Sequence, residues 1–284
     1  MRYIIFAPNF SKSAGVRALY RLSELLEARG LEAPVLCEKG DGKHHCITQF
    51  TREMQENDII IYPEIIKGNP LLFRRVVRYV LYYPGVLGGD ERYAANEYVI
   101  TWDAIYLDGV PVLNLPLMDA NLFYDEHLPK TQNCIFIHKG GIWRDIPELK
   151  SAVHITMDYP KDREELASLL KTTDILYSYD KYSMLNDEAF ACGANVKIIT
   201  EHGFEDYQKP QEFDPVRLEE QLNSFVQATG QMKASSPVSP FTRAERLFFW
   251  YKLAQYHILA RVWNSEKYQR RIRKYRFQLG LPCD

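Results

Sequence analysis

The chain has 284 residues, of which 46% are apolar, 25% charged and 13% aromatic, a composition typical of a globular protein long enough for two domains. A formal net charge of −2 excludes a chain that is basic overall, and five cysteines without a CxxC pair exclude a disulfide framework and a zinc ribbon. Every apolar run is too short to span a bilayer, so we expect a cytoplasmic protein with reduced thiols.

The first part of the chain alternates predicted strands with predicted helices. Helices are expected at 16–29, where leucines recur at helical spacing before Gly30, and at 70–82. Strands are expected at 3–7, 33–37, 58–62, 97–101, 104–107 and 110–113. This alternation predicts parallel βαβ units.

The same alternation restarts after the polar stretch 119–133. Helices are expected at 162–171, where Asp162 and Glu165 form a capping-box pattern, and at 183–192. Strands are expected at 134–138, 153–156, 174–178 and 195–200. We therefore predict an α/β fold of two Rossmann-like, doubly wound halves with a C-terminal helical extension. The predicted boundaries are 1–125, 126–230 and 231–284.

The segment 177–193 is the most informative for function, because it runs from a strand through a loop into a helix. The helix begins at Ser183 and Met184, and a helix N-terminus with its unpaired N–H groups suits a diphosphate. Glu188 lies one turn inside, where it would accept hydrogen bonds from a ribose diol. Asp180 lies on the loop over the carboxyl edge of the strand. The alternative is that Asp180 is a turn residue and Glu188 an exposed helix residue.

Asp180 and Glu188, followed by Ala189 and Gly193, resemble the E-x7-E motif of retaining glycosyltransferases with the GT-B fold, the family 4 type in particular. The first acid is Asp here instead of Glu. The resemblance implies that Asp180 contacts the donor sugar, that Glu188 holds the ribose, and that transfer retains configuration without a metal or cofactor. We expect transfer from a nucleoside-diphosphate sugar to a glycan or lipid-linked acceptor hydroxyl, in bacterial surface polysaccharide or glycolipid assembly.

Other candidate site residues follow strands at positions where ligands bind in α/β proteins. Lys139, Gly140 and Gly141 are expected to contact phosphate, because Lys supplies a charge and glycines allow close backbone approach; a surface turn is the alternative. Gly15 belongs to a loop that resembles the acceptor-side loop of GT-B enzymes. Asp103 is the acid/base candidate of the first half, or a turn residue. The pair of histidines before Cys46 is interpreted as a polar loop, and no metal site is expected.

The C-terminal region is strongly basic. Residues 243–276 hold ten Lys/Arg and two Asp/Glu, and their apolar stripe consists of Leu247, Tyr251, Ala254, Ile258 and Val262. The stripe either packs on the body or lies on an anionic bilayer, with 267–277 as the basic contact. We expect no nucleic-acid partner, because the rest of the chain is acidic. The alternative to an enzyme is a non-catalytic Rossmann-pair binding module that docks through this tail on a partner or on the inner membrane surface.

Overall fold

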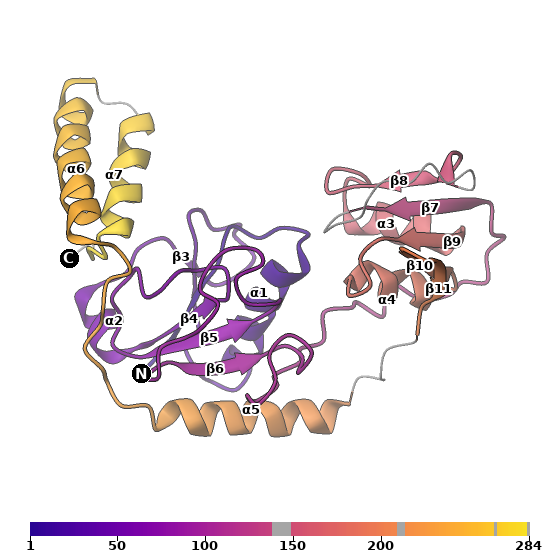
Figure 1. The fold of residues 1–284 in the computed structure, drawn as a ribbon, viewed down its shortest axis with the longest axis horizontal. Coiled ribbons are helices and arrows are strands. Elements are labelled where there is room, and N and C mark those ends of the chain that lie inside the picture. The colour runs from indigo at the N-terminus through magenta and orange to yellow at the C-terminus, as the bar shows by residue number, and fades with distance from the viewer. Residues whose placement is uncertain (138–148, 209–213, 264–265, 283–284) are drawn as a thin grey trace. The chain divides into compact units, whose positions relative to one another are not determined.

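The computed structural model describes residues 1–137, 149–208, 214–263 and 266–282 (Figure 1). It contains two compact units. The first unit combines Met1–Leu115 with Asp214–Asp284, and the second unit is Pro116–Phe213. Each unit has its own sheet of mostly parallel strands, so the protein is a mixed α/β protein.

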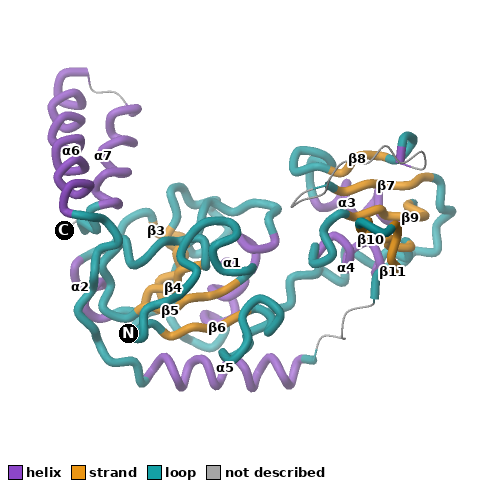
Figure 2. Tube along the Cα trace, viewed as in Figure 1, coloured by secondary structure: helices purple, strands orange, loops and turns teal. Residues whose placement is uncertain are grey.

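The described part of the first unit forms a sheet of six strands in the order β3-β2-β1-β4-β5-β6, and all neighbouring pairs are parallel. This order is that of a doubly wound sheet, whose two halves extend in opposite directions from β1 and β4. The strands are β1 (Tyr3–Phe6), β2 (Val35–Leu36), β3 (Cys46–Ile47), β4 (Ile59–Pro63), β5 (Val76–Val80) and β6 (Tyr98–Thr101). The connections from β4 to β5 and from β5 to β6 are loops (Figure 2).

Alternating side chains of the central strands enter two different cores. Tyr3 and Ile5 of β1 pack in the core that contains α1 (Ala14–Glu27), whereas Ile4 packs in the core that contains Met54 of α2 (Arg52–Asn57). Successive side chains of a strand point to opposite faces of its sheet, so a continuous apolar run is what burial on both faces requires. The predicted strands 3–7 and 58–62 and the predicted helix 16–29 are confirmed.

Three predicted elements of this unit are wrong. Residues 76–80, inside the predicted helix 70–82, form β5, because a run of β-branched and aromatic residues favours a buried strand. Residues 104–107 form a turn and 110–113 contribute only a single bridge, from Val112 to Thr101. The short elements β3 and α2 were not expected.

Helix α5 (Pro215–Gly230), which the sequence groups with 126–230, packs in the core of the first unit. Its buried residues Leu218, Leu222 and Phe225 join the core around β1. Thr229 and Tyr3 also form a buried hydroxyl–hydroxyl hydrogen bond of 2.8 Å. The chain therefore returns to its first unit after completing the second.

In its described residues, the second unit has five strands in the order β11-β10-β9-β7-β8, parallel except for the antiparallel β10–β11 pair. The strands are β7 (Gln132–Phe136), β8 (Val153–Ile155), β9 (Thr173–Ser178), β10 (Asn195–Thr200) and β11 (Gly203–Asp206), and only β11 was not expected. Helix α3 (Arg163–Lys171) begins as predicted, since the Asp162 carboxylate accepts the Glu165 N–H at 2.9 Å. Helix α4 (Met184–Ala191) lies within the predicted helix 183–192 and differs from it by one residue at each end.

The C-terminal helices α6 (Arg243–Trp263) and α7 (Glu266–Gln278) lie side by side (Figure 1). They share a small apolar core, in which the rings of Tyr256 and Tyr275 stack at 5.7 Å between centroids. The end of α7 is attached to the rest of the first unit. The ring of Phe277 packs against that of Phe6 with 5.3 Å between centroids, and the Gln55 amide donates to the Gly280 carbonyl at 2.9 Å.

The apolar stripe predicted along α6 is exposed. The exposed fractions of Leu247, Tyr251 and Ile258 are 70%, 63% and 64%. The interpretation that this stripe packs on the body is therefore wrong for these residues. The side chain of Val262 lies outside the described residues. In the described part of the chain, no helix combines the length and the apolar character needed to cross a membrane.

Candidate functional site

The sheet of the second unit has a topological switch point between β7 and β9. The chain leaves β7 for β8 on one side and returns to β9 on the other side of β7. Ligands of open α/β sheets bind outside the carboxyl ends of the strands at such a point, because the loops diverge there. The turn from β9 to α4 starts at this edge and carries the motif residues 180–188.

Asp180 organises this turn and is 7% exposed. Its backbone carbonyl accepts hydrogen bonds from the Ser178 hydroxyl (3.1 Å), the Asn186 amide (2.8 Å) and the Ser183 N–H (3.2 Å). Its carboxylate Oδ1 accepts the Tyr182 N–H at 3.2 Å, as an aspartate does in an Asx turn. Asp180 therefore lies directly at the edge where the motif predicts it, and it also shapes the turn.

Helix α4 begins at Ser183, whose hydroxyl accepts the Leu185 N–H at 3.3 Å. Ser183 and Met184 are half-buried, so the first turn is partly accessible. The first N–H groups of a helix have no partner within the helix, and the aligned peptide dipoles give this end a partial positive charge. The Leu185 and Asn186 N–H groups both donate to Ser183, so the start of α4 offers a phosphate group chiefly its partial positive charge.

Glu188 is buried and ion-paired, instead of exposed on the helix surface. Its Oε1 lies 2.8 Å from Nη1 of Arg163, the first residue of α3. The same guanidinium stacks on the ring of Phe123, 4.4 Å from its centroid. Arg163 therefore holds the Glu188 carboxylate in one orientation. Arg163 was not among the predicted site residues, because no local pattern in the sequence links it to a residue 25 positions later.

Asn186 is a second residue that the sequence analysis missed. It is fully buried, and its amide nitrogen donates to the carbonyls of Asp180 (2.8 Å) and Lys181 (3.3 Å). Its Oδ1 is buried without a hydrogen-bond partner among the described residues. Asn186 ties the turn to the helix, a role for which asparagine in a first helical turn is suited.

Asp187 connects α4 to the end of the sheet. Tyr207, which follows β11, donates a hydrogen bond from its hydroxyl to the Asp187 carboxylate. Burial raises the pKa of the Asp187 carboxyl above its ordinary value, and this effect exceeds that of the Tyr207 hydrogen bond, which lowers the pKa. The ionised carboxylate is therefore less stable in the folded chain than in water.

We expect Asp187→Asn to raise the melting temperature near pH 7, because the amide keeps an acceptor for Tyr207 and carries no buried charge. A carboxyl whose pKa is raised on folding destabilises the fold above that pKa and has no such effect below its unfolded pKa of about 3.9. The advantage of the variant should thus shrink as the pH falls and vanish below that value. Thermal melts from neutral to acid pH, with exposed Asp158→Asn as the control, measure this; a pH-independent difference would contradict it.

The remaining predicted site residues are not part of this turn. Lys139, Gly140 and Gly141 lie outside the described residues. Gly15 is in the first turn of α1, where an added Cβ would meet only Leu81, at 3.8 Å, so nothing there requires glycine.

The acid/base candidate of the first unit closes a turn after β6. Asp103 is exposed, its Oδ1 accepts the Ile105 N–H at 2.9 Å, and its carbonyl accepts the Thr101 hydroxyl at 2.8 Å. This is an Asx turn, which agrees with the turn alternative for this residue.

The paired histidines contact nearby acids. His44 Nδ1 lies 2.6 Å from Asp41 Oδ2, and His45 contacts Glu27. Within the ranges that the structure describes, no three His, Cys, Asp or Glu side chains are grouped as metal ligands would be.

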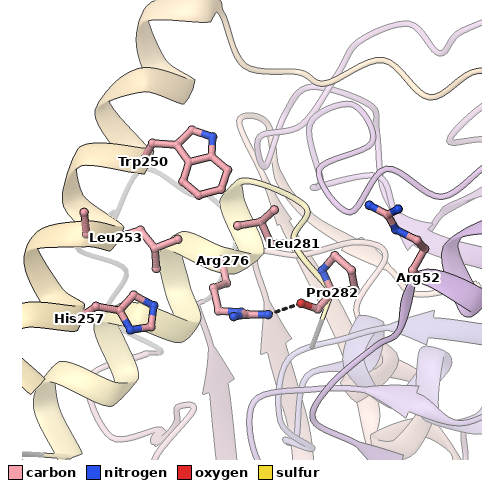
Figure 3. Close-up of a pocket in the computed structure, with 8 residues that line it drawn as sticks. Arg52, Trp250, Leu253, His257, Arg276, Leu281 and Pro282 are labelled. Carbon is pink, nitrogen blue, oxygen red and sulfur yellow. Dashed lines mark hydrogen bonds between the residues drawn. The ribbon is translucent and has the colours of Figure 1, made fainter. Parts of the chain in front are cut away.

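A cavity of about 660 Å³ lies in the first unit. Trp250, Leu253 and His257 of α6 line one side, and Arg276 of α7 and Arg52 of α2 line others (Figure 3). The Arg276 guanidinium donates to the Pro282 carbonyl, while its Nε is buried without a partner in the described chain. The cavity thus combines apolar walls with two arginines.

A comparison of the chain with models of known protein families finds no match. A comparison with curated proteins likewise finds no significant match.

Proposed function

We propose that the protein is a glycosyltransferase that takes its sugar from a nucleoside-diphosphate donor and has a GT-B-like arrangement. The second unit would bind the donor at the β9–α4 turn, and the first unit would take the acceptor. Retention of configuration, independence of metal and a glycan or lipid-linked acceptor in surface polysaccharide or glycolipid assembly belong to the same proposal, because the motif resemblance implies them.

One observation carries this proposal. Two mostly parallel sheets, each with a topological switch point, are built one after the other, and the chain then returns to the first unit through α5. Two Rossmann-like halves with C-terminal helices on the body are what the GT-B resemblance implies. Asp180 at the switch point of the second sheet adds support, because the motif requires an acid there.

The chemistry would be electrostatic. When the bond between sugar and diphosphate breaks, negative charge grows on the leaving phosphate, and the partial positive charge at the start of α4 would stabilise it. Asp180 would contact the sugar, and Glu188, oriented by Arg163, would accept from the ribose.

A nucleotide screen tests the proposal at the level of binding. UDP, GDP, ADP and CMP are added in thermal-shift measurements on the full chain. A nucleotide at 100 times its dissociation constant stabilises a fold by about 2.7 kcal/mol, and we expect one of the diphosphates to do so. If none of the four shifts the melting temperature, the donor assignment fails and the non-catalytic binding module is favoured.

Glu188→Gln separates the binding role from the ion pair. If Glu188 holds the ribose, losing a charge-assisted hydrogen bond worth about 1.5–3 kcal/mol lowers nucleotide affinity on the order of 10- to 100-fold. Titration calorimetry measures this, with exposed Glu164→Gln of α3 as the matched control. A variant that melts earlier but binds the nucleotide as tightly as the wild type would show that Glu188 serves only Arg163.

A further inference from the structure

The outward face of α6 is apolar and exposed. Leu247, Tyr251, Ala254 and Ile258 recur at intervals of three and four residues, so they form one stripe along the helix. The residues of α6 that are buried in the shared core with α7 lie on the opposite face; they are Phe249, Leu253 and Ala260. The stripe therefore points away from the helix that α6 packs against. Clustered exposed apolar residues of this kind mark an interaction surface.

The charges around this stripe identify the partner. Arg243 lies four residues before Leu247 and Arg261 three residues after Ile258, so exposed arginines lie in line with the stripe at both ends. Glu245 lies on another face of α6, where its carboxylate accepts the N–H and the hydroxyl of Thr242, each at 2.8 Å. An apolar stripe between cations complements an anionic lipid surface.

The basic segment 267–277 of α7 is less suited to this contact, although it has the higher charge. Arg270 is paired with Glu38 at 2.8 Å, and Arg276 donates to the Pro282 carbonyl. Phe277 packs against Phe6. Part of this segment is thus engaged within the first unit, whereas the exposed apolar surface lies on α6.

We propose that the outward face of α6 docks on an anionic lipid bilayer. The stripe enters at the level of the headgroups, and Arg243 and Arg261 contact lipid phosphates. The cavity lined by Trp250 and Leu253 adjoins this face, because Ala254 belongs to both. This docking does not depend on the glycosyltransferase proposal, since it uses none of the residues of the second unit.

Flotation of the full chain with lipid vesicles tests the proposal. We expect binding to phosphatidylcholine vesicles that contain phosphatidylglycerol, and much weaker binding to vesicles of phosphatidylcholine alone. Binding should fall at 1 M salt, where the Debye length is about 3 Å and the attraction is screened. Equal binding to both vesicles, or no binding at low salt, would overturn the proposal.

Two sets of substitutions locate the surface. Combined Leu247→Ser, Tyr251→Ser and Ile258→Ser should reduce binding at least about tenfold, because the apolar area that enters the headgroups is lost. The double variant Arg243→Gln, Arg261→Gln should reduce binding about 25-fold, and only to anionic vesicles, since each cation near the surface contributes about fivefold. The matched control changes three apolar residues that are equally exposed elsewhere: Val86→Ser, Val216→Ser and Val238→Ser.

The control variant should bind vesicles like the wild type, and circular-dichroism melts should be unchanged in all variants, because every changed residue is exposed. Unchanged vesicle binding by the serine variant would overturn the proposal. Light scattering without lipid tests whether a second copy of the chain covers this face instead. If the wild type is a dimer and the serine variant is a monomer, the face is a dimer interface and the membrane proposal is overturned. Nucleotide binding, measured in parallel, should be the same in every variant, so this proposal and the donor proposal can fail separately.

Discussion

Replacing Arg78 by alanine is expected to lower the free energy of unfolding by about 3–5 kcal/mol, because it leaves a buried charge without its partner. Arg78 is fully buried in the middle of β5, and its guanidinium donates to both carboxylate oxygens of Glu97, at 2.8 and 3.0 Å. It also donates to the carbonyls of Ile66, at 2.7 Å, and of Gly68. One side chain therefore satisfies two carbonyls of the β4–β5 loop and one acid of the β5–β6 loop.

Chemical denaturation of the variant measures this loss. Arg21→Ala is the matched control, since Arg21 forms an ion pair of the same 2.8 Å length with Glu24 on the surface of α1. Exposed pairs contribute about 0–1 kcal/mol, so the control should unfold almost like the wild type. Similar losses in the two variants would show that the buried network does not stabilise β5 and its loops.

The second large effect is expected for Gly89→Ala. Gly89 has a φ of +78°, and a Cβ there would lie 1.9 Å from the Glu64 carbonyl oxygen, at the carboxyl end of β4. The left-handed conformation costs a non-glycine residue about 1–2 kcal/mol, and relieving the overlap costs about 1–3 kcal/mol more. We therefore expect a loss of about 2–5 kcal/mol in the free energy of unfolding.

Gly109→Ala separates the two contributions to that loss. Gly109 has nearly the same φ, +77°, but an added Cβ there meets no atom within 4 Å. This control should lose only the conformational part, about 1–2 kcal/mol. Denaturation curves that show equal losses for both variants would contradict the close packing of the loop around Gly89 against β4. The structure places the backbone of this loop against Glu64 and Ile65.

Much of each sheet could be predicted from the sequence alone. A parallel strand with both faces covered needs a continuous apolar run, and such runs predicted β1, β4, β7 and β9 within a residue or two of their positions. Helix starts could be predicted for the same local reason. The Asp162 and Ser183 side chains accept N–H groups two or three residues ahead of them, so these caps depend only on neighbours in the chain.

Part of the candidate site was also predictable from local order. Asp180 and Ser183 lie at the carboxyl edge of β9 because a strand, a short loop and a capped helix follow one another. For Glu188, only part of the environment was predictable. Its distance in sequence from Ser183 places it one turn inside α4, but its ion pair is with Arg163, on a helix that begins 25 residues earlier in the chain. No spacing rule reaches that far.

For the remaining elements, only the tertiary structure decided whether they are helix or strand and what covers their apolar faces. Residues 70–82 were predicted as a helix, and only the distant Glu97 makes the burial of Arg78 in a strand possible. Helix α5 was not predicted from the sequence, and its contact with Tyr3 shows that the first unit covers its apolar face. The stripe of α6 has the same local pattern and stays exposed. Periodicity reveals that a helix has an apolar face, while long-range contacts decide what, if anything, covers it.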